Sequence, residues 1–177
     1  MTLLGPSLAD LLRFCGGSFS LKTVLMLGLQ MVQRIQHMHT QTFIHRDIKP
    51  ENFLMGLDDQ SHVLYMIDLG FATSHVDPVT KKHIKFRKKD SLTGTASFAS
   101  INAHNGHELS RRDDLESIAY LMVYMFKGNL PWNEIRSELT FKNFSKIKES
   151  KEQISLTELI QGFPKEMKQF IMYCREL

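Results

Sequence analysis

One stretch of eight residues constrains this chain more strongly than any other. Residues 45–52 read HRDIKPEN, so a carboxylate (Asp47), an ammonium group (Lys49) and an amide (Asn52) share one short loop. Asp47 could accept the proton of an attacking hydroxyl, and Lys49 could neutralise charge on a transferred phosphoryl group. Asn52 could offer its carbonyl oxygen to Mg²⁺. The loop therefore predicts a phosphoryl-transfer site, and the alternative interpretation is a turn with surface charges.

A second motif follows at residues 68–70, which read Asp-Leu-Gly. The apolar run 63–67 before it predicts a buried strand. A strand that ends at Asp68 would deliver a carboxylate to a fixed point, and Gly70 would let the backbone turn away without a steric cost. Because Mg²⁺ prefers oxygen ligands, Asp68 and Asn52 together predict an incomplete metal site that the phosphates of ATP would complete.

Composition indicates one globular domain. The chain has 177 residues, of which 42% are hydrophobic, and this is enough for a single core. The net charge of +3 does not by itself indicate nucleic-acid binding. Cys15 and Cys174 lie far apart, so we expect no disulfide or zinc site, and we interpret the eight histidines as ordinary surface or core residues. No run approaches the roughly 18 apolar residues of a membrane span, and no signal peptide is evident, so we expect a soluble intracellular protein, cytoplasmic or nuclear.

Helix signals recur along the chain. Ser7 can cap a helix through about Phe14, and Ser20 can start a long helix to about Thr40. The core side of this long helix is expected to carry Val24, Leu25, Gly28, Val32 and Ile35, together with Met26, Met31 and Met38.

Further elements follow the two motifs. We expect short strands at 53–55 and 63–67, and a central helix from about 112 to 127 that Gly128 ends. A charged surface helix is expected over 142–152, and a last amphipathic helix starts at Pro164. The predicted fold class is mainly α with small β-hairpins.

Residues 73–105 are irregular and polar, and a loop of this length within a domain is usually functional. One interpretation is an acceptor surface for acidic or phosphorylated peptides, and the other is a solvated loop. Nucleic-acid binding is disfavoured, because Phe86 alone interrupts the basic run with an aromatic ring. The basic residues are Lys81, Lys82, Lys85, Arg87, Lys88 and Lys89.

Together these segments resemble the casein kinase I family of Ser/Thr protein kinases, whose catalytic loop follows the general kinase pattern HRDxxxxN. The Ser-Ile-Asn at 100–102, in place of Ala-Pro-Glu, is particular to that family. The segments that carry the resemblance are 3–8 (LLGPSL), 52–56 (NFLMG), 92–96 (LTGTA), 99–102 (ASIN), 110–117 (SRRDDLES) and 130–132 (LPW).

The resemblance implies an ATP- and Mg²⁺-dependent enzyme that phosphorylates Ser and Thr hydroxyls of protein substrates. It also implies that residues 1–177 form a protein-kinase-like C-terminal lobe with its hinge, incomplete at both ends. The residues placed around the nucleotide are Thr2, Leu3 and Leu4 at the hinge, Leu54 and Ile67 under the adenine, and Ser7 and Asp10 at the ribose edge.

The same resemblance assigns roles around the catalytic loop. Asp114 would anchor the backbone of His45 and Arg46, and Thr95 would bind near Asp47 and Lys49. The residues given a catalytic role are Asp47, Lys49, Asn52 and Thr95, with Asn52 and Asp68 as metal ligands and with His45, Arg46, Gly70 and Asp114 as support.

Some family features are altered. Leu69 replaces the usual Phe, Ser97 stands where an arginine is usual, Asp90 replaces a lysine, and residues 139–143 replace a basic stretch. The Leu69 change is conservative. By the resemblance, the changes at Ser97, Asp90 and residues 139–143 fall on the family's site for phosphorylated substrates, where Arg87, Lys88 and Lys89 are candidate replacements. No segment matches the glycine-rich loop, the β3 lysine or the αC glutamate. A non-catalytic or weakly active binding module is therefore the alternative function.

Overall fold

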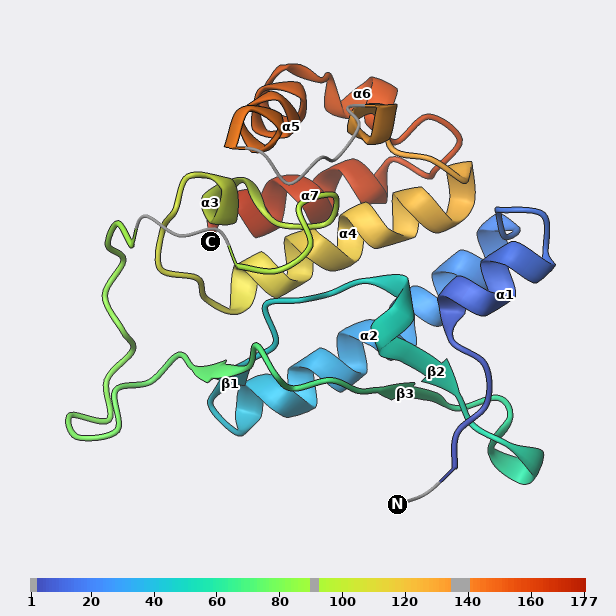
Figure 1. Cartoon of the computed structure of the whole chain (residues 1–177), viewed down its shortest axis with the longest axis horizontal. Helices are drawn as coiled ribbons and strands as arrows, with labels where there is room; N and C mark the ends of the chain where they lie inside the picture. The colour runs from blue at the N-terminus through green and yellow to red at the C-terminus, as the bar shows by residue number, and fades with distance from the viewer. Residues whose placement is uncertain (1–2, 90–92, 135–140) are drawn as a thin grey trace.

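The computed structural model describes residues 3–89, 93–134 and 141–177, which form a mainly helical fold with two small sheets (Figure 1). The expected fold class, mainly α with small β-strands, is confirmed. The helices are α1 (Leu8–Phe14), α2 (Leu21–Thr40), α3 (Ile101–His104), α4 (Arg111–Lys127), α5 (Phe141–Gln153), α6 (Leu156–Leu159) and α7 (Glu166–Glu176), with the 3-10 turns η1 (Pro50–Asn52), η2 (Asp58–Gln60) and η3 (Pro131–Glu134).

The predicted helix boundaries follow from local capping. Ser7 accepts a hydrogen bond from the Asp10 amide (3.1 Å), and Ser20 accepts one from the Thr23 amide (3.2 Å), so α1 and α2 begin where expected. Helix α4 ends at Gly128, whose φ of +77° is in the left-handed region. Glycine adopts this conformation without a Cβ penalty, which explains the stop.

Helix α4 lies at the centre of the molecule and packs against α2 on one side and α7 on the other (Figure 1). Most of its apolar positions are buried, as expected for a central helix, whereas Leu115, Tyr124 and Phe126 are partly buried. A Cβ at Gly28 of α2 would lie 2.6 Å from the Met122 side chain of α4, so glycine permits the close approach of these two helices. The fully buried residues of α4 are Ile118, Ala119, Tyr120, Leu121, Val123 and Met125.

Two expectations about helix faces are wrong. Leu25 and Met26 on α2 are 42% and 59% exposed, because the face that packs on α4 runs through Val24, Leu27 and Met31 instead. Helix α5 does not lie wholly on the surface, since its Lys151 is fully buried. None of the described helices is long and apolar enough to cross a membrane.

The two sheets position the loop of residues 45–52. Strands β2 (Phe53–Met55) and β3 (Leu64–Met66) form an antiparallel hairpin in which residue 53 faces residue 66. Strand β1 (Phe43–Ile44) pairs with β4 (Thr73–Ser74), from the start of the polar segment. The loop therefore enters from one sheet and leaves into the other, which fixes both of its ends. Within the segment expected to be irregular, β4 and α3 are regular, and single β-bridges join 76 to 83 and 88 to 107.

Candidate active site

Asp47 is the centre of a compact hydrogen-bonded group. Its side chain is 2% exposed, and Oδ2 accepts a hydrogen bond from Lys49 Nζ at 2.6 Å. Oδ1 accepts two more from Thr95, from the amide at 2.9 Å and from Oγ1 at 2.8 Å. Asn52 Nδ2 donates to the Asp47 carbonyl oxygen at 2.8 Å. The structure therefore brings together the four residues expected to have a catalytic role, although Thr95 is 48 residues from Asp47.

These contacts set the protonation of the site. Burial alone would raise the pKa of the Asp47 carboxyl, but the hydrogen bonds from Lys49 and Thr95 outweigh it and bring the pKa below its ordinary value. The hydrogen bond to Asp47 raises the pKa of Lys49, and the charges of Asp47, Glu51 and Asp68 add to this effect. At neutral pH the site therefore holds a carboxylate and an ammonium group.

Asp114, at the start of α4, fixes the backbone of the loop. Its carboxylate accepts hydrogen bonds from the His45 and Arg46 amides, each at 2.9 Å. His39 Nε2 lies 2.8 Å from Asp114 Oδ2 and adds a third partner from α2. Sequence reasoning missed His39, because the 75 residues between His39 and Asp114 leave no local signal. A buried carboxylate with three partners is a rigid anchor.

Two backbone features, at Arg46 and Gly94, determine how neighbouring segments contact the loop. Arg46 has a φ of +69°, and its Nε donates to the Phe71 carbonyl oxygen at 2.6 Å. Gly94, with a φ of +90°, lies directly on the Arg46 carbonyl oxygen, where an added Cβ would be only 2.2 Å away. Glycine at this position therefore lets the segment before Thr95 dock against the loop.

Asp68 follows β3 beside the end of the catalytic loop. The Ile67 amide donates to the Asn52 carbonyl oxygen at 3.0 Å, so Asp68 and Asn52 come from adjacent backbone positions of the hairpin. Asp68 is exposed, has a φ of +61°, and accepts a hydrogen bond from the Gly70 amide at 3.2 Å. Asp47 and Asp68 both lie near Lys49, since the negative charge of each raises the pKa of Lys49.

The donor set fits a magnesium ion. Asn52 uses its Nδ2 on Asp47, and within the described ranges no residue donates to its Oδ1. Asp68 is open to solvent and adds carboxylate oxygens. Mg²⁺ prefers hard oxygen ligands and usually keeps water or phosphate oxygens in its remaining positions. One amide oxygen and one carboxylate are therefore a sufficient protein contribution.

Most of the residues expected around a nucleotide lie in the segment before α1 or on the hairpin of β2 and β3. Ser7 forms a β-bridge with Leu54, so the segment before α1 pairs with β2. Leu54 and Ile67 are half-buried, whereas Leu3 is 80% exposed and Leu4 is half-buried. Thr2 lies outside the described residues. Ser7 and Asp10 bind each other at 2.6 Å in the capping box of α1, and Asp10 also pairs with Arg13, so their polar atoms already have partners in the protein.

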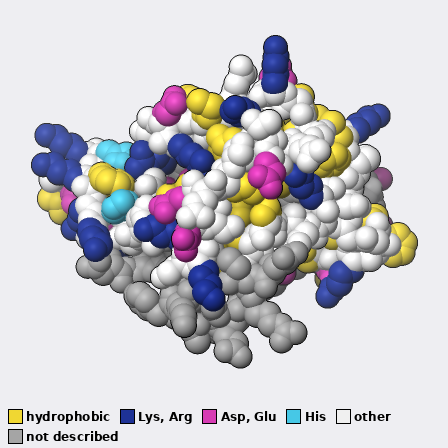
Figure 2. All heavy atoms as spheres, turned by 90° about the horizontal axis from the view of Figure 1, so that it is seen from above, with side chains coloured by type: hydrophobic (Ala, Val, Ile, Leu, Met, Phe, Trp, Pro, Cys, Tyr) yellow, Lys and Arg dark blue, Asp and Glu magenta, His cyan; other side chains and the backbone are white. Residues whose placement is uncertain are grey.

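The basic segment is organised differently from what its sequence suggests. Arg87 Nε and Lys89 Nζ both bind the Glu108 carboxylate, at 3.0 and 3.2 Å. Lys88 forms a backbone bridge with His107, and Asp90 lies outside the described residues. Sequence reasoning missed Glu108, whose single negative charge is shared between Arg87 and Lys89 and offsets part of their positive charge. Figure 2 shows Lys, Arg and His side chains gathered at the left end of the molecule, where Figure 1 draws residues 76–89.

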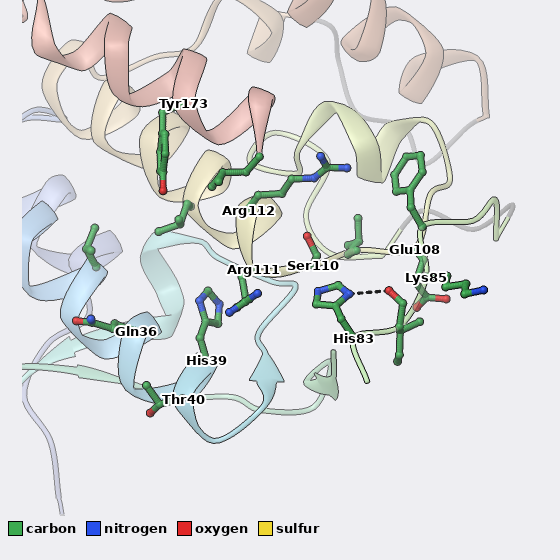
Figure 3. A pocket seen from close by; sticks show the side chains of 16 residues that line it. Gln36, His39, Thr40, His83, Lys85, Glu108, Ser110, Arg111, Arg112 and Tyr173 are labelled. Atoms are coloured by element: carbon green, nitrogen blue, oxygen red, sulfur yellow. Dashed lines mark hydrogen bonds between the residues drawn. The ribbon is translucent and has the colours of Figure 1, made fainter. Parts of the chain in front are cut away.

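A cavity of about 970 Å³ lies between α2, the start of α4, residues 83–86 and the end of α7 (Figure 3). Its wall includes His39, which links it to the Asp114 anchor. Arg111, Arg112 and Lys85 give the cavity a positive lining. None of the residues grouped around Asp47 lines it, so the cavity is separate from the candidate active site.

Comparison with protein families agrees with this geometry. The model of the protein kinase domain matches residues 2–177, which is nearly the whole chain. Proteins with this domain use ATP and act on protein substrates. The family match rests on the overall sequence pattern, and the arrangement around Asp47 is consistent with it. This chain belongs to the protein kinase domain family.

Proposed function

We propose that this chain is a Ser/Thr protein kinase of the casein kinase I type, which transfers the γ-phosphoryl group of ATP to protein hydroxyls. Residues 1–177 would then supply the hinge and most of the C-terminal lobe. The observation that carries the proposal is the fixed carboxylate of Asp47, which Lys49 and Thr95 hold from opposite oxygens. Phosphoryl transfer depends mainly on positioning and charge neutralisation, and such a group supplies both.

Asp47 would orient the substrate hydroxyl. Its lowered pKa makes it a weak base at neutral pH, so it would accept the proton only as the oxygen–phosphorus bond forms. Lys49 is bound to Asp47 yet partly exposed (24%), so its ammonium group can also reach a phosphate oxygen. Thr95 would keep the carboxylate from rotating, because it occupies Oδ1 with two donors.

Asn52 and Asp68 would hold the metal. When bound there, Mg²⁺ supplies positive charge that neutralises the phosphate oxygens of ATP. Leu54 and Ile67 would contact the adenine, with Leu3 and Leu4 at its edge. Ser7 and Asp10 are proposed at the ribose edge, where the exposed carboxylate of Asp10 and the half-buried hydroxyl of Ser7 are compatible with contact from a ligand hydroxyl.

Contacts of the Ser-Ile-Asn segment support the casein kinase I type. Ser100 Oγ and Asn102 Nδ2 both donate to Asp113 Oδ1, at 2.7 and 3.2 Å. Asp113 is 4% exposed, and it also accepts from the Ser110 amide at the start of α4. The segment 100–102 and the segment 110–117 therefore form one interlocked unit, and both belong to the residues that resemble this family.

Substrate preference depends on the charges of the basic segment. Arg87 and Lys89 are already paired with Glu108, and Ser97 carries no charge. We therefore propose protein substrates in general, with a weak preference for acidic peptides through the basic segment.

The test compares the natural chain with Asp47→Asn. In the variant, transfer of phosphate from ATP to casein or an acidic Ser peptide should fall by about 10²–10⁴-fold, as is usual on loss of a general base. Binding of Mg²⁺·ATP, measured by calorimetry, should be nearly unchanged, because Asp47 does not hold the nucleotide. Asp59→Asn, on the exposed turn η2, is the control for loss of a carboxylate.

Equal activity of the natural chain and Asp47→Asn would refute the assignment of Asp47. If the natural chain neither binds Mg²⁺·ATP nor transfers phosphate, the alternative function of a non-catalytic binding module is favoured instead.

A further inference from the structure

Lys151 on α5 is a buried cation that the catalytic scheme does not use. Its relative exposure is 0%, and its ammonium group lies 4.7 Å from the centroid of the Tyr120 ring and 5.0 Å from that of Trp132. Burial lowers the pKa of Lys151, and the charge of Glu116 opposes this shift. Buried cations are costly unless they are well paired, so its partners indicate what it is for.

The partners of Lys151 are backbone carbonyls rather than a carboxylate. Nζ donates to the carbonyl oxygens of Ala96 at 2.9 Å and Ala99 at 2.6 Å, and it lies 3.2 Å from His104 Nε2. The two carbonyl oxygens accept from Lys151. Burial lowers the pKa of His104 to about 3, so this ring is neutral, and its Nε2 donates to the Ala96 carbonyl oxygen at 3.1 Å, which adds a second hold on the same segment. Trp132 adds a further anchor, since its Nε1 donates to the Ser97 carbonyl oxygen at 2.8 Å.

The anchored segment leads directly to Asp47. The amides of Phe98 and Ala99 donate to the Thr95 carbonyl oxygen, each at 3.0 Å. Thr95 in turn donates twice to Asp47 Oδ1. A continuous chain of hydrogen bonds therefore runs from the Lys151 ammonium group through residue 99 and Thr95 to the carboxylate of the catalytic loop.

We propose that Lys151 is a positioning residue for phosphoryl transfer: from the interior it fixes residues 96–99, and through them it holds Thr95 against Asp47. This inference rests on the proposed kinase function, because it concerns the orientation of the same carboxylate. It assigns a role to α5, which contributes no residue to the group around Asp47. The segment 96–99 also follows Thr95 at the edge of the site, so its placement affects how a protein substrate binds.

The test is Lys151→Met, which keeps most of the side-chain volume but removes all three donors. The matched control is Lys148→Met on the same helix, whose partly exposed ammonium group pairs with Glu152 at 3.8 Å. Hydrogen exchange by NMR should show a Thr95 amide that exchanges at least ~10-fold faster in Lys151→Met, whereas amides of α4 such as that of Val123 keep their protection.

Kinetics supply the second measurement. In Lys151→Met, kcat should fall and the KM for the peptide should rise, so that kcat/KM drops by about 10²-fold, while the KM for ATP changes little. Combining Lys151→Met with Thr95→Val should add little to the loss, because both changes break the same chain of contacts. Lys148→Met should match the natural chain in every measurement.

Several outcomes would overturn the proposal: unchanged exchange of the Thr95 amide, equal loss of protection in α4, or a higher KM for ATP of the same size as that for the peptide. If Lys151→Met does not fold, Lys151→Gln, which retains one donating group, takes its place. Failure of both variants to fold would make Lys151 a purely structural core residue. If the natural chain itself transfers no phosphate, the kinase proposal fails, while amide exchange still decides whether Lys151 holds Thr95.

Discussion

The catalytic loop and the basic segment 81–89 are both short, polar and highly charged, but their charges have different surroundings. In the loop, Asp47 is 2% exposed and Lys49 24%, and each binds the other. In the basic segment, Arg87 and Lys89 are 66% and 46% exposed, and both bind one carboxylate, Glu108. Charges that are held and partly dehydrated can act on a ligand at fixed geometry, whereas exposed ion pairs typically contribute only about 0–1 kcal/mol.

The origin of this difference lies in how each segment is attached. Side chains from distant elements bind the loop: Asp114 from α4 and Thr95 from the segment before α3. The basic segment is attached through backbone contacts, for example from the Lys89 amide to the Gly106 carbonyl oxygen at 2.6 Å. Its ion pairs with Glu108 lie at the surface, where Arg87 and Lys89 stay largely exposed to water.

The largest predicted effect removes the anchor of the loop. Asp114→Ala leaves the His45 and Arg46 amides and the His39 ring without their acceptor in the interior. The free energy of unfolding should fall by roughly 3 kcal/mol, because buried donors would be left unsatisfied. Urea denaturation measures this, with Asp59→Ala as an exposed control. An equal loss of stability in Asp114→Ala and Asp59→Ala would mean that Asp114 stabilises the loop no more than an exposed carboxylate does.

An intermediate effect is expected at Gly94. Gly94→Ala places a Cβ 2.2 Å from the Arg46 carbonyl oxygen and also strains a φ of +90°. Gly16→Ala is a matched control, since Gly16 has a φ of +74° with no atom within 4 Å of the added Cβ. We expect Gly94→Ala to lower stability by about 2 kcal/mol and Gly16→Ala by about 1 kcal/mol, as measured by thermal unfolding. Phosphate transfer should fall in Gly94→Ala alone, and a similar loss in both variants would exclude a specific effect on the loop.

The smallest effect concerns the basic segment. Burial alone would raise the pKa of Glu108, but hydrogen bonds from Arg87 and Lys89 outweigh it and lower the pKa from its ordinary value of 4.5. The ion pairs therefore contribute stability above pH 4.5, and this contribution is lost as the pH falls through the lowered value. Glu108→Gln should cost about 1 kcal/mol at pH 7 and flatten the pH dependence of stability below pH 4.5.

The same variant tests the charge balance of the segment. With Glu108 neutral, Arg87 and Lys89 become available to an anion, so the affinity for a phosphorylated peptide should rise several-fold at low salt and the gain should shrink at high salt. Glu176→Gln, at the exposed end of α7, is the control for a change of net charge. An equal rise in both variants would mean that overall charge, rather than this ion pair, governs binding.

Many helix ends could be predicted from local sequence signals. Ser7 and Ser20 start helices and Gly128 ends one, because capping depends on a residue and its neighbours within one turn. The face of α2 was less predictable. Leu25 is one position from Val24, and only the approach of α4 decides which of these two apolar side chains is buried.

The chemical groups of the site are encoded in two short motifs, 45–52 and 68–70, which carry the carboxylates, the amide and the ammonium group. The residues that support this site give no such local signal. His39, Glu108 and Lys151 each find their partner in another segment, and Lys151 binds carbonyl groups more than 50 residues away. A polar side chain becomes a support only when burial removes its water and a distant acceptor replaces it, and both conditions are met only in the folded molecule.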